Sequence, residues 1–311
     1  MADRKVLVGD VDSLTGIVAH GSFDAGDTLV DPTGAPLVEI TPAWYYGTGQ
    51  DGDVTITSNT TLNANVMYNN LTIAPGVVVT LNGYVLMVKD TLTLGNGARI
   101  SRDGNNGSGG TGGANLNPFI YAGSGIGGNS SAAGGSSNNS FGGSGGKGGN
   151  SGATVGGNGG TAGLVTEANG GSVNKASLHT LTTGLLISNT GRTGGGSGGG
   201  GGAVTSGTGG GGGSGGGVGV VFANKIVVSG TASITANGGN GANGTTNAGG
   251  GGGGGGGFVA VVSSYPQPAG LTLTANGGLG GNGAGANGQA GTAGSPGTTV
   301  FHVWKETKAT A

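Results

Sequence analysis

Short runs of β-branched and aliphatic residues alternate with turn residues between Asp53 and Ile100. Apolar runs of four to six residues stand in steps such as VTIT, NLTIAPG, VVVTLNG, VLMVKD and TLTLGNG. Runs of this length at such short spacing predict β-strands, arranged either as a β-solenoid or as a meandering sandwich. The side chains expected to line the core are Leu71, Ile73, Val77, Val79, Leu81, Leu86, Val88, Leu92 and Leu94.

The second part of the chain contains a repeated step that ends a strand and enters a glycine-rich stretch. It reads ISRDGNNG from Ile100, ITANGGNG from Ile234 and LTANGGLG from Leu273. A β-like run follows each stretch, so the stretches are predicted to be excursions that return to a β-core. The predicted excursions are Gly104–Gly217, Gly238–Gly257 and Gly277–Gly297, and the predicted return strands are Val218–Ala223, Phe258–Ser263 and Thr299–Trp304.

Glycine content limits how these excursions can be built. Glycine makes up 83 of 311 residues, and only 11 of these glycines precede Asn96. Collagen requires glycine at every third position and abundant proline, whereas these runs are irregular and the chain has eight prolines. A flexible low-complexity linker is one interpretation. We favour ordered excursions packed as polyglycine II-like helices, because chains without Cβ atoms can approach closely and share backbone hydrogen bonds.

The N-terminal segment has its own composition and is predicted to be a small β module. It holds 7 of the 13 acidic residues. Its short β-like pieces, separated by Asp, Gly and Pro, are Lys5–Val8, Gly16–Ala19, Thr28–Val30 and Pro36–Ile40. We therefore expect an all-β chain in four parts: the N-terminal module at 1–46, a β-rich solenoid or sandwich segment at 47–103, a glycine-rich domain with interleaved strands at 104–304, and a tail at 305–311.

Charge, cysteine content and hydropathy exclude several function classes. Only 8% of residues are charged and the formal net charge is -2, so no phosphate-neutralising surface is expected and nucleic acid is not an expected partner. The chain has no cysteine, which excludes disulfides and thiolate metal sites. No run approaches the roughly 20 apolar residues of a membrane span, and no signal peptide is recognisable. We expect synthesis in a host cytoplasm without membrane insertion.

Residues suited to catalysis or metal binding are sparse. Beyond residue 103 the acidic residues are Glu167 and Glu306. A two-carboxylate site of the kind that cleaves polysaccharides would have to draw on turn-like positions, namely Asp51, Asp53, Asp90 and Asp103. The excursions lack the aspartates of calcium-binding glycine repeats, and the three histidines are scattered. We therefore expect no enzymatic activity, no cofactor and no metal site.

Isolated aromatic residues in the longest excursion are the candidates for contact with a partner. Phe119, Tyr121 and Phe141 either fill gaps between packed glycine segments or stand exposed on a rigid tip. An exposed aromatic side chain presents a large contact area at low entropy cost. In the second case these three residues would contact the sugar rings or the protein loop of a receptor.

The stretch DGDVTITSNTTLNANVMYNNLTIAPGVVVTLNGYVLMVKDTLTLGNGARIS and the glycine blocks after it resemble the glycine-rich fibre and adhesin proteins of bacteriophages. The likeness covers Asp51–Trp304. It implies polyglycine-type helices packed in layers, with loops between them that recognise the host surface, as in tail-fibre tip adhesins. The runs GGNGGTAG and ANGGLGGNG also resemble repeats of mycobacterial surface proteins, but the Pro-Glu helical domain of those proteins has no counterpart here.

The phage resemblance implies a non-enzymatic virion structural protein, a fibre or tail-tip adhesin that displays a rigid surface for receptor binding. The N-terminal module would attach to other tail or capsid proteins, the glycine-rich end would bind a host cell-surface glycan or outer-surface protein, and a homotrimer is expected by analogy. Two alternatives stay open: a capsid decoration or head-fibre protein with a purely structural role, and a polysaccharide-cleaving β-helical spike. An ice-binding bundle would need a flat Thr/Ala face, which the irregular glycine runs do not provide.

Overall fold

The computed structural model describes residues 46–116, 124–136, 142–161 and 196–303, together with the backbones of two short N-terminal strands. These are β1 (Lys5–Leu7) and β2 (Thr28–Val30), which pair in parallel as two of the predicted N-terminal strands. The other two, Gly16–Ala19 and Pro36–Ile40, lie outside the described residues. The described part of the chain is rich in strands and contains no α-helix. Within the described ranges no helix is long and apolar enough to span a membrane.

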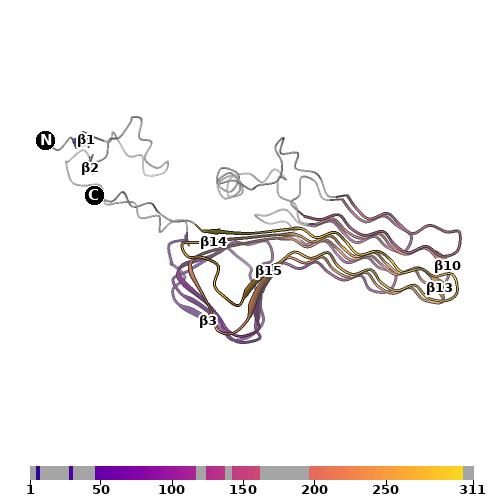
Figure 1. Cartoon of the computed structure of the whole chain (residues 1–311), viewed down its shortest axis with the longest axis horizontal. Coiled ribbons are helices and arrows are strands. Elements are labelled where there is room, and N and C mark those ends of the chain that lie inside the picture. The colour runs from indigo at the N-terminus through magenta and orange to yellow at the C-terminus, as the bar shows by residue number, and fades with distance from the viewer. Residues whose placement is uncertain are drawn as a thin grey trace.

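Two parallel sheets contain most of the strands. The strands of the first sheet are β3 (Val54–Ile56), β5 (Val66–Tyr68), β6 (Leu71–Ile73), β8 (Leu86–Leu94), β11 (Val218–Val228), β14 (Phe258–Ser263) and β16 (Thr298–Val303). The strands of the second sheet are β4 (Thr60–Thr61), β7 (Val78–Thr80), β9 (Ala98–Ser101), β12 (Ala232–Thr235) and β15 (Leu271–Thr274). The chain passes back and forth between the two sheets, so successive coils stack on one another (Figure 1).

The register of the strands confirms the repeat found in the sequence. Ile234 pairs with Ile100 on one side and with Leu273 on the other, so the three copies of the step lie one above the next. In the first sheet, β8 is followed by β11, β14 and β16 in that spatial order. Strands from the predicted segment 47–103 and from the predicted domain 104–304 therefore share both sheets.

Aliphatic side chains fill the space between the two sheets. All nine predicted core residues are buried, and they belong to one cluster that β11, β12 and β14 extend with Val221, Ile234 and Val259. Burial of each such side chain contributes about 1.5–3 kcal/mol. A second cluster on the other face of the first sheet contains Phe258 and Tyr46.

The glycine-rich excursions begin and end where the sequence predicted. They leave after β9, β12 and β15, and they return at β11, β14 and β16. Figure 1 shows the described parts running side by side from the coils to a distant end, where β10 (Val204–Ser206) pairs with β13 (Asn247–Ala248). We call the residues 104–116, 124–136, 142–161, 196–217, 236–257 and 275–297 the glycine bundle.

Backbone hydrogen bonds in the glycine bundle repeat every third residue. Along residues 209–217, the N–H groups of Gly210, Gly213 and Gly216 donate to the carbonyl oxygens of Gly249, Gly252 and Gly255, at 2.9 Å each. The N–H groups one position further along, of residues 211, 214 and 217, donate to the carbonyl oxygens of residues 109, 105 and 102. Those of residues 212 and 215 donate to the carbonyl oxygens of residues 128 and 125. A single run is thus bonded to three different neighbours in turn.

Glycine runs broken only by Ser197, Ala203 and Ser214 occupy the interior of the bundle. Residues 196–203, 209–217 and 249–257 are buried throughout, and all three follow the same three-residue rule. A Cβ built on Gly213 would overlap the carbonyl oxygen of Gly239, and one on Gly254 would overlap that of Ser214. Side chains are therefore excluded here because neighbouring backbones occupy the space.

Candidate functional site: the asparagine face and the distal end of the bundle

Segments at the surface of the bundle have a larger side chain at every third position and mostly glycine or alanine between these positions. In residues 236–245 the third position is always asparagine, at Asn237, Asn240 and Asn243. The Oδ1 atom of each asparagine accepts a hydrogen bond from one backbone N–H group of the adjacent segment. In the same order, the donors are Asn276 at 2.9 Å, Leu279 at 2.8 Å and Asn282 at 2.8 Å. The asparagine side chains thereby accept every third N–H group of the adjacent segment.

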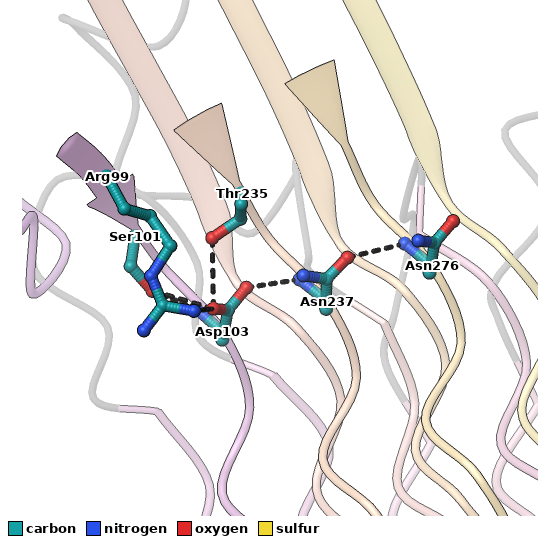
Figure 2. Close-up of polar contacts among 6 residues, drawn as sticks. All are labelled: Arg99, Ser101, Asp103, Thr235, Asn237 and Asn276. Atoms are coloured by element: carbon teal, nitrogen blue, oxygen red, sulfur yellow. Dashed lines mark hydrogen bonds and ion pairs between the residues drawn. The ribbon is translucent and has the colours of Figure 1, made fainter. Parts of the chain in front are cut away.

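The same contact continues onto the first excursion, which makes a ladder across three segments. The Oδ1 atom of Asp103 accepts from the N–H of Asn237 at 2.6 Å, as Figure 2 shows for the row from Asp103 to Asn276. In the next row, the Oδ1 atom of Asn106 accepts from the N–H of Asn240 at 2.7 Å. We call this surface the asparagine face; its side chains are Asp103, Asn106, Asn237, Asn240, Asn243, Asn276, Leu279 and Asn282.

Asp103 anchors the end of the face nearest the coils. Its Oδ2 atom accepts from the hydroxyls of Ser101 and Thr235, both at 2.9 Å, and lies 3.4 Å from Nη1 of Arg99 (Figure 2). The adjacent Arg102 is buried between the coils and the bundle, and burial lowers its pKa to about 10. Asp103, considered from the sequence as a carboxylate for catalysis, is thus engaged by four donors.

An open depression of about 670 Å³ lies along the face beside Arg99. Its lining includes Gly104, Gly238 and Gly278, which have no side chains. Arg99 and the asparagine face up to Leu279, which is 67% exposed, also line it. The depression therefore combines a cation, amide groups and one apolar side chain on a backbone whose position is fixed by hydrogen bonds.

The distal end of the bundle consists of tight turns rich in Ser, Thr and Asn. We define it as residues 108–111, 129–132, 151–154, 204–208, 243–248 and 284–288. The turns are cross-linked: the buried hydroxyl of Ser151 lies within hydrogen-bond distance of Thr205 Oγ1, at 2.8 Å, and of the carbonyl oxygen of Asn247. The distal end contains no charged residue, and Lys147 is the one charged residue among the described residues of the bundle.

The three aromatic residues predicted to contact a receptor, Phe119, Tyr121 and Phe141, lie outside the described residues, so their role stays a prediction. In the described ranges no group of three or more His, Cys, Asp or Glu residues is placed to hold a metal ion.

Two of the remaining acidic candidates pair with backbone and amide groups of the coils. Asp51 accepts from the N–H of Met67 at 2.7 Å. Asp53 accepts from the side chains of Asn69 at 2.8 Å and Asn70 at 3.0 Å, and these bonds lower its pKa. Burial raises the pKa of Tyr46, whose hydroxyl oxygen accepts a hydrogen bond from the Ser264 hydroxyl at 3.0 Å. These contacts tie one coil to the next.

Comparison with protein-family models, with characterised proteins and with solved structures gives no match for this chain.

The asparagine face was missed in the sequence although its signal is present there. Asn237, Asn240 and Asn243 are spaced by three residues, and Asn276 and Asn282 repeat the spacing in the next excursion. The sequence pattern treats them only as part of the repeated step that leads from a strand into a glycine-rich stretch. The three-residue period becomes meaningful once the segments are known to have three neighbours each.

Proposed function

We propose that this chain is a bacteriophage virion structural protein, a fibre or tail-tip adhesin, that presents the distal end of a rigid glycine bundle to a host receptor. The observation that carries the proposal is the bundle itself: buried glycine runs hydrogen-bonded to three neighbours, projecting from stacked coils and ending in cross-linked polar turns. An extended rigid element with an uncharged end is suited to display.

In this proposal the coils are a short β-solenoid and the bundle consists of polyglycine II-like helices. Polyglycine and polyproline II helices have three residues per turn, which matches the three-residue period of the hydrogen bonds. The solenoid reading is supported by parallel pairing throughout both sheets. The N-terminal module would join other tail or capsid proteins, with three copies of the chain in each fibre.

Pre-organisation gives the display role its physical basis. Ordering a flexible loop on binding costs about 0.5–1.5 kcal/mol for each immobilised side chain. In the distal end, Thr208 donates its N–H to Thr245 Oγ1 at 2.9 Å, and Gly152 donates to the carbonyl of Asn287 at 3.1 Å. Turns already held in this way pay less of that cost when a receptor binds.

The test uses phage particles that carry the chain and their host cells. Gold-labelled antibody against the chain should mark the tail tip or a fibre, and added purified chain should reduce adsorption of the particles. Ser206→Arg places bulk and charge on an exposed position of the distal end and should abolish this competition, whereas Thr272→Arg makes a comparable change on an exposed strand of the coils and should leave it intact.

The outcomes separate the candidate roles. Particles without label would overturn the virion assignment. Labelled particles whose adsorption is unaffected by the purified chain would overturn the receptor role and favour the capsid decoration role.

A further inference from the structure

We propose that the depression on the asparagine face binds a carboxylate-bearing sugar unit of a surface polysaccharide. This inference rests on the proposed function and names a ligand class for a second surface, on the side of the bundle, apart from the distal end. It is carried by three features that meet in one place: unused amide donors in fixed positions, an arginine with spare donors, and an exposed apolar side chain.

The amide groups of the face are oriented by their ladder bonds. An asparagine amide is planar, with an acceptor oxygen and two N–H donors. Asn106 and Asn240 each use Oδ1 to accept a backbone N–H, which fixes the plane of the amide. Among the described residues, no hydrogen-bond partner occupies the Nδ2 atoms of Asn106, Asn237 or Asn240. The depression thus presents donors in an ordered array.

Arg99 supplies the charge for a carboxylate. It makes one contact with Asp103, at 3.4 Å, and its side chain is 43% exposed. A guanidinium has five N–H donors and binds carboxylates in a bidentate manner, so most of its donors remain available. Asp103 already accepts from Ser101, Thr235 and the N–H of Asn237. The surplus in the depression is therefore of donors, which suits a ligand rich in acceptors.

Leu279 explains why the ligand should be a sugar unit and not a small anion. It takes the place that asparagine holds at 276 and 282, in the middle of the same segment, and it is 67% exposed. Sugar rings have a face of C–H groups that packs on apolar side chains, while their hydroxyl and carboxylate oxygens accept hydrogen bonds. Arg99, Asn240 and Leu279 all line the same depression, so an oligosaccharide lying along it can contact the three together.

The experiment is calorimetric titration of the full chain with trigalacturonate, in parallel with its methyl ester, which keeps the rings and loses the charge. Trigalacturonate should bind and the ester should bind at least about tenfold more weakly, equivalent to 1.4 kcal/mol. Asn240→Asp retains the oxygen that accepts from Leu279 but replaces the Nδ2 donor by a charged acceptor. It should lower the affinity for trigalacturonate at least about tenfold, as should Arg99→Gln.

The matched control is Asn59→Asp, which adds the same charge at an asparagine in the coils that also accepts a backbone N–H, from Val78 at 2.9 Å. It should bind trigalacturonate like the unchanged chain. Equal binding of the ester, unchanged binding by Asn240→Asp and Arg99→Gln, or no binding of trigalacturonate would each overturn the proposal. Because this titration involves neither particles nor cells, its failure is distinct from a failure of the adsorption test.

Discussion

With one interior glycine replaced by alanine, the bundle should unfold at a much lower urea concentration. A Cβ on Gly213 would overlap the carbonyl oxygen of Gly239, so the neighbouring segment must move away. That movement strains bonds on each side, including those from Gly213 to Gly252, from Gly199 to Gly213 and from Gly239 to Ser214. At about 1 kcal/mol for each of these three bonds and about 1–3 kcal/mol for overpacking, Gly213→Ala should destabilise the chain by about 4–6 kcal/mol.

Gly219→Ala is the matched control, because Gly219 is also buried but its added Cβ finds ordinary contacts. The nearest atoms are Leu81 Cδ1 at 3.4 Å and Arg102 Cβ at 3.6 Å. Alanine at an unstrained position stabilises by about 0.4–1 kcal/mol through the unfolded state, so this variant should match or exceed the parent. Urea unfolding followed by circular dichroism measures both. Equal midpoints for the two variants would refute close backbone approach as the reason for glycine at 213.

Three further changes test other parts of the structure. Tyr46→Phe should reduce the loss of stability above pH 10. Because burial raises the pKa of Tyr46 in the folded chain, the unfolded chain ionises first, and stability falls as pH rises towards the folded-state pKa. Unfolding midpoints measured between pH 9 and about 11 check this. Asp53→Asn should make stability depend less on pH in acid. The lowered pKa of Asp53 gives stability that is present above pH 3.8 and is lost as pH falls through the folded-state pKa. An unchanged decrease of the urea midpoint in acid would contradict this. Exchanging Gly239 and Asn240 keeps the composition but puts a side chain against the backbone of a neighbouring segment, so the exchanged chain should unfold well before the single variant Asn240→Gly in a thermal melt.

The sequence predicted the strands and the limits of the excursions well because each depends on local or repeated signals. The core positions of the coils, from Leu71 to Leu94, are buried as expected, and the copies of the step at Ile100, Ile234 and Leu273 are in register. Such signals persist because each coil must place an apolar side chain at the same point of the core.

The arrangement inside the bundle could not be read in the same way. Gly213 is bonded to Gly252, 39 residues further along the chain, while Gly211 donates to Gly109, on the first excursion. Glycine carries no side chain that records which neighbour lies on which side. The sequence therefore indicated that segments pack closely but not which segments meet, and the asparagine face, which depends on that order, was not predicted.

The three-residue period of the hydrogen bonds relates the spacing of glycines in a segment to whether that segment lies inside the bundle or at its surface. A segment with neighbours on all three sides has no direction free for a Cβ, which is why residues 209–217 are glycine apart from Ser214, whose hydroxyl accepts from the N–H of Asn105 at 2.8 Å. A segment at the surface has one free direction, and there Asn237, Asn240 and Asn243 appear at every third position. The irregularity that set these runs apart from collagen thus follows from position: glycine broken only by small buried residues such as Ser214 marks the interior, and the exposed side chains at every third position mark the surfaces available to a partner.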